Sequence, residues 1–339
     1  MRTSDLSPRA SGPLAGIALL ALALSGCGKA AAPVAPAADR VPQSALRAEL
    51  AGAGGLAQGG QSANLFYPLQ LGNHWGYEFT LSFYIIPDGG PPGPAFGLSQ
   101  PRDRDLVCIE DRAGRSYVVE RRSYPGGLFD WVRYRQDGAG LYEADVESPL
   151  PPDCAGVSGR QTFDAEGVAA ASGEAAWAGV EAKLTDPAKQ LAYRAAWERI
   201  QARALALRQA LGAAPGIPRT AAGGGVEPGE ITRLEYPLHP GARWMIRADP
   251  RFESIVEGAE VLDLAVGHVP GWRIRIESVF FGPDDRVRIW YGRGGFLKLE
   301  AYFEGIATDP SGNRLGRLIS EESEVLTEVT LGGGRFAAR

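Results

Sequence analysis

Few side chains in this sequence have the types and spacing that metal binding requires. A zinc site needs three or four converging His, Cys or carboxylate ligands, and the only histidines are His74, His239 and His268. His74 and His239 lie in two copies of one repeated motif, but at different positions within it. The copies therefore predict no shared metal site, and we expect neither a metal nor an organic cofactor.

Hydrolytic chemistry would need a nucleophile with a base, or a pair of carboxylates. Ser158 lies in the sequence Gly-Val-Ser-Gly, which lacks the second glycine of a nucleophile elbow and follows no strand-like run. The adjacent acids Asp284 and Asp285, and likewise Glu321 and Glu322, fall at turn-like or solvated positions. We therefore expect no enzymatic activity. The alternative is an envelope-polymer hydrolase with strand-borne carboxylates about 5–10 Å apart, one with a raised pKa.

Cys27 is the residue whose setting indicates a definite reaction. The polar start of the chain includes Arg2 and Arg9, and an apolar run follows at 14–24. A charged start and a short apolar run are the layout of a secretory signal peptide, which we place at residues 1–26. The run is shorter than the ~20 residues that a membrane-spanning helix needs.

The run ends in Leu24-Ser25-Gly26-Cys27, which resembles the lipobox of bacterial lipoproteins at every position. The resemblance covers only residues 1–30, and it implies cleavage before Cys27. It further implies a diacylglyceryl thioether on the sulfur and an acyl group such as palmitate on the new amine, and two or more acyl chains anchor a protein stably. Gly28 in place of Asp implies the outer membrane, with the body facing the periplasm. The alternative is a secreted protein with an unmodified Cys27.

The two remaining cysteines, Cys108 and Cys154, form an even pair in an exported chain. Such a pair is most simply a disulfide. Cys108 lies in a strand-like run and Cys154 in a Pro-rich loop, so a bridge would hold the loop to the sheet. Two free thiols are the alternative.

Charge and composition restrict the partners. Removing residues 1–26 takes away Arg2, Arg9 and Asp5, so the net charge moves from −5 to −6. An acidic body argues against nucleic acid, since phosphate binding needs clustered Lys and Arg. Residues 27–63 are Ala, Pro and Gly with scattered charge, and we expect a disordered tether after the lipidated cysteine.

The body, residues 64–332, contains the motif Y-P-L-x-x-G-x-x-W twice. We assign one repeat to 66–150 and the other to 235–332, with a helical insert at 170–230. Pro fixes φ, Gly permits a tight turn and Trp fills the end of a sheet, so each copy predicts the start of a strand. The shared residues are Tyr67, Pro68, Leu69, Gly72 and Trp75 in the first copy, and Tyr236, Pro237, Leu238, Gly241 and Trp244 in the second.

Strand signals follow each copy. The predicted strands, separated by Gly- and Asp-containing turns, are 106–110, 116–121, 129–136, 141–144, 272–280, 287–291, 297–303 and 325–331. In 272–280 the residues Trp272, Ile274, Ile276 and Phe280 share the face that we expect in the core. The pattern is that of an antiparallel meander.

The insert has the pattern of a helix. Asp186 can cap it, Pro187 lies in its first turn and Gly212 stands just past its end. Its apolar stripe comprises Tyr193, Trp197, Ile200, Ala204, Leu207 and Leu211. We therefore predict a mainly β fold, an antiparallel meander forming a curved sheet or half-barrel, with this amphipathic helix packed on it. The alternative is that the helix forms a lid, or a surface for a partner or anionic lipid.

The segment Tyr67–Tyr77 reads Y-P-L-x-x-G-N-x-W-x-Y, and Ile289–Lys298 contains W-Y and a run of glycines. Both segments are similar to uncharacterised bacterial envelope lipoproteins. The resemblance covers scattered parts of residues 66–300, and the helical insert departs from it. It implies an architecture and no chemistry.

Together these features predict a membrane-anchored cell-envelope lipoprotein that is not a catalyst. We expect its β body to bind an apolar ligand inside the curved sheet or a protein partner on it. The carrier version requires a cavity, and a filled core would exclude it. A purely structural envelope protein is a further alternative.

Overall fold

The computed structural model describes residues 66–112, 114–125, 128–144, 154, 174, 177–211, 230–248 and 250–332. The signal peptide, Cys27, the tether and Ser158, all assigned from sequence, lie outside the described residues. No helix among the described residues combines the length and the apolar character needed to cross a membrane.

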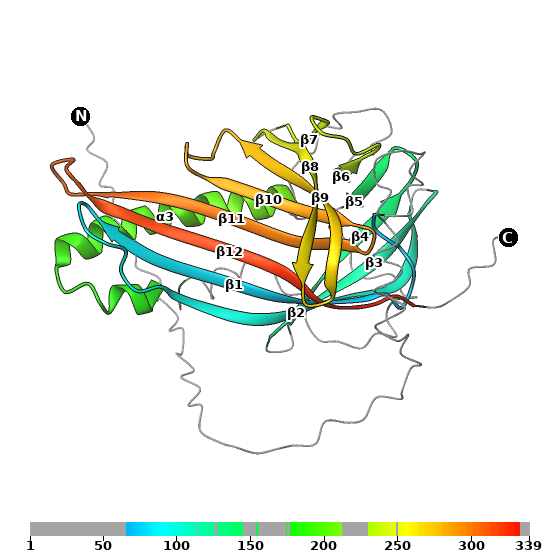
Figure 1. The fold of residues 1–339 in the computed structure, drawn as a ribbon, viewed down its shortest axis with the longest axis horizontal. Helices are drawn as coiled ribbons and strands as arrows, with labels where there is room; N and C mark the ends of the chain where they lie inside the picture. The colour runs from blue at the N-terminus through cyan, green and yellow to red at the C-terminus, as the bar shows by residue number, and fades with distance from the viewer. Residues whose placement is uncertain are drawn as a thin grey trace, which may run out of the picture. The chain divides into compact units, whose positions relative to one another are not determined.

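The described body contains twelve strands, one long helix and a short helical segment at 177–181 (Figure 1). The first six strands are β1 (His74–Pro87), β2 (Phe96–Arg112), β3 (Arg115–Tyr124), β4 (Leu128–Gln136), β5 (Gly140–Ala144) and β6 (Glu230–Glu235). The helix α3 (Pro187–Leu211) comes between β5 and β6. The last six strands are β7 (Arg243–Arg247), β8 (Phe252–Leu264), β9 (Gly267–Ser278), β10 (Arg286–Gly292), β11 (Gly295–Thr308) and β12 (Arg314–Thr330).

All twelve strands belong to one antiparallel sheet in the order β6-β5-β4-β3-β2-β1-β12-β11-β10-β9-β8-β7. The sheet consists of two six-stranded meanders, β1–β6 and β7–β12, joined where β1 pairs with β12. The two edge strands, β6 and β7, approach each other, and the Trp244 indole N–H donates to the Thr232 carbonyl at 3.2 Å. The sheet is therefore nearly closed, and the predicted mainly β meander is confirmed.

Strand alternation accounts for most of the core. In β1 the odd positions from Trp75 to Phe83 are buried, while Glu78 and Thr80 are exposed. The predicted hairpins are present, and β2 and β12 are longer than their sequence signals indicated. One expectation is wrong: Phe280 is 48% exposed, because β9 ends at Ser278 and the chain turns before its side chain can join the core.

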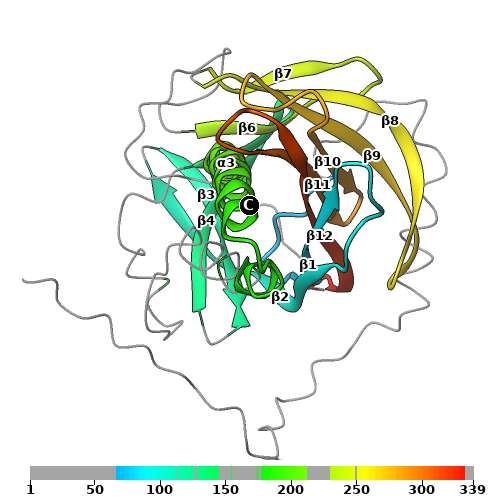
Figure 2. The ribbon, with the colours of Figure 1, turned by 90° about the vertical axis from the view of Figure 1, so that its left-hand side faces the viewer.

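The helix α3 forms as predicted. The Asp186 carboxylate accepts a hydrogen bond from the Ala188 N–H at 2.9 Å, a side-chain cap of the first turn. The stripe residues from Tyr193 to Leu207 are buried. Figure 2 shows α3 on the inner side of the curved sheet, where the Trp197 ring meets Phe83 at 4.4 Å. The contact is close: a Cβ at Gly305 of β11 would lie 2.9 Å from the Ala196 carbonyl oxygen.

The two motif copies build the same turn. Gly72 and Gly241 have φ of 83° and 84°, a conformation that other residues rarely adopt. The Gly72 N–H donates to the Leu106 carbonyl at 3.0 Å, and the Gly241 N–H donates to Val256 at 2.8 Å. The pairing register then shifts just after Leu106 in β2 and just after Val256 in β8. Each copy thus starts the first strand of a meander and joins it to the second.

The Cys108 and Cys154 sulfurs are bonded in the structure, with Cα atoms 5.7 Å apart. Cys154 packs with Val119, Phe129 and Trp131 in a small cluster separate from the main core. We expect the protein, when produced in an oxidising compartment, to gain the mass of two hydrogens on reduction under denaturing conditions. An unchanged mass, with both thiols open to alkylation before reduction, would show that the cysteines are free.

Candidate functional site

The histidines do not converge. His74 Nδ1 lies 2.8 Å from Asp105 Oδ1, and this hydrogen bond raises the pKa of the imidazole against the opposing effect of burial. His239 lies in the connection between β6 and β7, His268 lies at the start of β9, and both are exposed. Within the described ranges no group of three or more His, Cys, Asp or Glu side chains could hold a metal ion.

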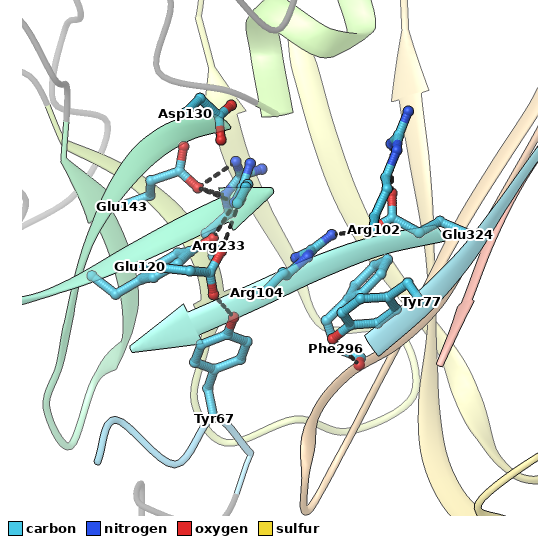
Figure 3. Close-up of polar contacts among 12 residues, drawn as sticks. Tyr67, Tyr77, Arg102, Arg104, Glu120, Asp130, Glu143, Arg233, Phe296 and Glu324 are labelled. Atoms are coloured by element: carbon cyan, nitrogen blue, oxygen red, sulfur yellow. Dashed lines mark hydrogen bonds and ion pairs between the residues drawn. The ribbon is translucent and has the colours of Figure 1, made fainter. Parts of the chain in front are cut away.

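The inside of the sheet instead holds a set of charged side chains that we call the interior charged cluster (Figure 3). Its members are Arg102, Arg104, Glu120, Arg122, Asp130, Glu143, Arg233 and Glu324. Cross-strand pairing places them on the core face, since Arg102 pairs with Tyr77 and Glu324 pairs with Phe79. The cluster therefore occupies positions where strand alternation alone would put apolar residues.

Glu324 of β12 holds the two arginines of β2. Arg102 Nη1 donates to Glu324 Oε2 at 2.9 Å, and Arg104 Nη2 donates to Oε1 at 2.5 Å. Burial alone would raise the pKa of Glu324, but the charges of Arg104 and Arg102 outweigh it and lower the pKa to about 2. The guanidinium groups also stack on rings: Arg102 lies 3.5 Å from the Phe79 centroid and Arg104 lies 4.4 Å from that of Phe296.

A second group centres on Arg122. Its Nε donates to Glu120 at 2.8 Å, its Nη2 donates to the Tyr134 hydroxyl at 2.6 Å, and Glu143 lies 3.7 Å away. The Tyr67 hydroxyl of the first motif copy donates to the other oxygen of Glu120. Arg233 donates to Glu143 Oε2 from both Nε and Nη2. These paired groups hold β3, β5 and β6 together across the inside of the sheet.

Asp130 differs from the other carboxylates of the cluster. The Tyr124 hydroxyl donates to its Oδ2 at 3.1 Å, while its Oδ1, like Glu143 Oε1, is buried without a hydrogen-bond partner. Burial raises the pKa of Asp130 to about 6, although the nearby Arg122 acts in the opposite direction. A raised pKa is one feature that a hydrolase would need.

A small pocket borders the cluster at Arg233. The inner pocket next to Arg233 and Tyr291 has a volume of about 10 Å³, which is close to the room needed by one water molecule. Small-molecule sites usually measure about 300–1,000 Å³. The large aromatics of the interior, among them Trp75, Tyr77 and Phe83, are buried. Buried aromatic side chains therefore fill much of the described interior.

A larger depression, the outer groove, lies on the opposite face of the sheet over β7–β10 and has a volume of about 770 Å³. Arg275 and Arg288 are paired neighbours on that face, while Ile274 and Ile289 point to the core. The turn after β9 forms one wall. The lining comprises Arg243, Arg251, Glu253, Glu257, Arg275, Ile276, Glu277, Ser278, Val279, Phe281, Gly282, Pro283, Asp285, Arg286 and Arg288.

Of the residues singled out from sequence, the structure brings the two motif copies into equivalent turns and joins Cys108 to Cys154. It places Asp285 in a buried position, not a solvated one, where it accepts a hydrogen bond from Arg203 of α3 at 2.7 Å. Glu322 is also buried. Neither the interior charged cluster nor the outer groove was found by sequence reasoning.

No family model and no curated protein sequence matches the chain. Among solved structures, it is similar to a protein assigned as exported, with a YmcC-like fold, from Bacteroides fragilis NCTC 9343. That match has a TM-score of 0.30 and 10% identity, and it covers 79% of this chain and 99% of the other. It is also similar to a protein assigned as a lipoprotein from Parabacteroides distasonis ATCC 8503, with a TM-score of 0.27, 10% identity, and coverage of 80% and 100%. Likenesses this weak transfer neither a fold family nor a function to the chain.

Proposed function

We propose that the chain is a lipid-anchored protein of the cell envelope whose β body binds a partner without catalysis. The observation that carries this proposal is the sequence Leu24-Ser25-Gly26-Cys27 at the end of a short apolar run. A lipid on Cys27, followed by the Ala/Pro/Gly-rich stretch up to residue 63, would hold the body close to a membrane. This membrane is proposed to be the outer membrane, because Gly28, and not an Asp, follows the cysteine.

The binding is assigned to the outside of the body and not to its interior. An apolar ligand of lipid size needs far more room than the inner pocket of about 10 Å³ offers. Aromatic side chains and arginine–carboxylate pairs fill the described interior. Of the two binding modes expected from sequence, a partner on the sheet surface is therefore the better supported.

The absence of catalysis is proposed on similar grounds. Glu120, Glu143 and Glu324 are each bound by arginines, so these carboxylates already take part in ion pairs within the fold. Asp130 alone has the raised pKa of a general acid, and no second carboxylate faces it across an open cleft of the described body. An activity assay against envelope polymers would test this part directly.

Replacing Cys27 by Ala is expected to abolish lipidation, because the thiol is the atom that receives the diacylglyceryl group. Cells expressing the chain would be fed an alkynyl palmitate, and the protein would be followed by label and by membrane fractionation. We expect wild-type protein to carry label and to sediment with outer membranes, and the variant to remain unlabelled.

The matched control is the double variant Cys108→Ser/Cys154→Ser, which removes the other two thiols and keeps Cys27. It should be labelled as wild type is. Palmitate label on Cys27→Ala, or no label on the wild-type chain, would contradict the anchor and with it the proposed function.

A further inference from the structure

The outer groove is positively charged although the chain as a whole is acidic. Five arginines line it, against the three glutamates Glu253, Glu257 and Glu277. The fourth acid, Asp285, is committed to Arg203 of α3. The net charge of the whole chain is −5, so this excess of positive charge is a local feature of β7–β10.

Carboxylates in and beside the groove are shared among several arginines. Glu257 lies 2.8–3.2 Å from the Nε atoms of Arg273, Arg275 and Arg288. Glu253 lies 3.0 Å from Arg251 and 3.9 Å from Arg243.

Arg286 stacks on Tyr302 at 5.1 Å and has no carboxylate partner among the described residues. Each guanidinium has five N–H donors, so the groove keeps donors for an anionic oxygen ligand.

An exposed apolar pair borders the same groove. Val279 is 74% exposed and Phe280 is 48% exposed, in the turn between β9 and β10. The next residue, Phe281, anchors this turn in the core, where its ring lies 5.9 Å from those of Phe252 and Phe303. Asp285 fixes the other end, since it accepts hydrogen bonds from the Gly282 and Glu304 N–H groups. The apolar tip is thus held in place beside the arginines.

We infer that this surface docks on a bilayer containing anionic phospholipids. The Val279–Phe280 tip enters the interface, and the arginines of the outer groove bind lipid phosphates. Apolar side chains next to arginines match the two layers of a bilayer surface, the acyl boundary and the phosphates. An acidic protein chain or glycan would use the arginines but would leave the exposed tip without a role.

The inference rests on the proposed function only in that a lipid anchor would bring the body to a membrane. The second contact would fix which face of the sheet is turned to the bilayer. A chain whose residues 27–339 carry a net charge of −6 is repelled from an anionic surface in other orientations. The outer groove is the part of the surface where the charge is positive and the interaction with an anionic bilayer is attractive.

The test uses the mature chain, residues 27–339, with Cys27→Ser so that no lipid is attached. Cosedimentation is measured with vesicles of phosphatidylcholine alone and with equal parts of phosphatidylcholine and phosphatidylglycerol, at low and high salt. We expect binding to the anionic vesicles only, weakened by salt. Arg251→Ala/Arg286→Ala should weaken it roughly 30-fold, and Val279→Ser/Phe280→Ser about tenfold or more.

The control substitutions are Val261→Ser and Arg314→Ala, exposed side chains outside the groove lining. They should bind as the parent chain does. Equal binding by all variants, or no binding to anionic vesicles, would overturn the inference. None of these results depends on Cys27, whose labelling tests the proposed function separately.

Discussion

Replacing Glu324 by Gln is expected to lower the free energy of unfolding by roughly 3–5 kcal/mol. Glu324 is the carboxylate that both Arg102 and Arg104 contact, and its side chain is only 9% exposed. The substitution keeps the size of the side chain and removes its charge. Two guanidinium groups would then remain in the interior without a counter-charge, and this desolvated excess of charge is the source of the cost.

The effect depends on pH in a defined direction. The pKa of Glu324 in the folded protein is lowered to about 2. Its contribution is therefore fully present above the pKa of a carboxyl in the unfolded chain, and it is lost as pH falls from about 4.5 toward 2. We expect wild type to lose stability over that interval. The difference from Glu324→Gln should shrink as the wild-type carboxylate becomes protonated.

Urea unfolding followed by circular dichroism measures this difference at neutral pH. Glu321→Gln is the matched control, since Glu321 lies three residues earlier in β12, is exposed and accepts an exposed hydrogen bond from Tyr84. Its effect should lie within about 0.5 kcal/mol. If Glu324→Gln proved no more costly than this control, the arginine pair would not depend on Glu324 as described.

The turns and the helix could be predicted because their signals are local. Asp186, Pro187 and an apolar stripe within one segment specify α3. Glycines that need positive φ mark the repeated turn at Gly72 and Gly241. Each signal lies within a window of a few residues, and no distant partner is needed to read it.

Strand β8 was missed for a physical reason. Its sequence FESIVEGAEVLDL carries glutamates and a glycine, and the register against β9 shifts between Val256 and Gly258. A bulge breaks the period of two on which the strand signal depends. The second motif copy predicts the start of a strand at β7, but the bounds of this strand could not be predicted because only five residues carry its pattern.

The interior charged cluster could not be found because its pairs are distant in sequence. Arg102 and Glu324 are 222 residues apart, and they meet only after β1 pairs with both β2 and β12. The inward residues Arg102 and Arg104 look like the exposed face of a strand when read alone. A run of polar residues on both faces of a long strand is a signal that could have indicated charged side chains inside the sheet.

The second large predicted effect concerns Asp130. Its carboxylate is expected to lower the stability of the folded protein, whereas that of Glu324 raises it. Its pKa in the folded protein is raised to about 6 from an ordinary 3.8, chiefly by burial. Below about pH 4 the carboxyl is protonated in both states and costs nothing. As pH rises toward 6 the unfolded chain ionises first, so the folded state loses stability and does not regain it at higher pH.

Asp130→Asn should therefore stabilise the protein at about pH 8 and have little effect at about pH 4. A shift of roughly two pKa units corresponds to about 3 kcal/mol, and because Asp130 is partly exposed we expect about 2 kcal/mol. The amide oxygen can still accept the hydrogen bond from Tyr124. Denaturant unfolding at several pH values measures the effect, with the exposed Asp88→Asn as the control.

A gain for Asp130→Asn that grows between pH 4 and pH 6 and then levels off would show that the buried carboxyl is ionised at neutral pH at the expense of stability. Such a cost at a partly exposed carboxyl is what a group retained for binding or proton transfer would carry, and it would make the interior charged cluster worth testing with small anions. A loss of stability at every pH would mean that the carboxylate is held by Arg122 more strongly than burial opposes it. Asp130 would then be one more member of the ion pairs that join the strands.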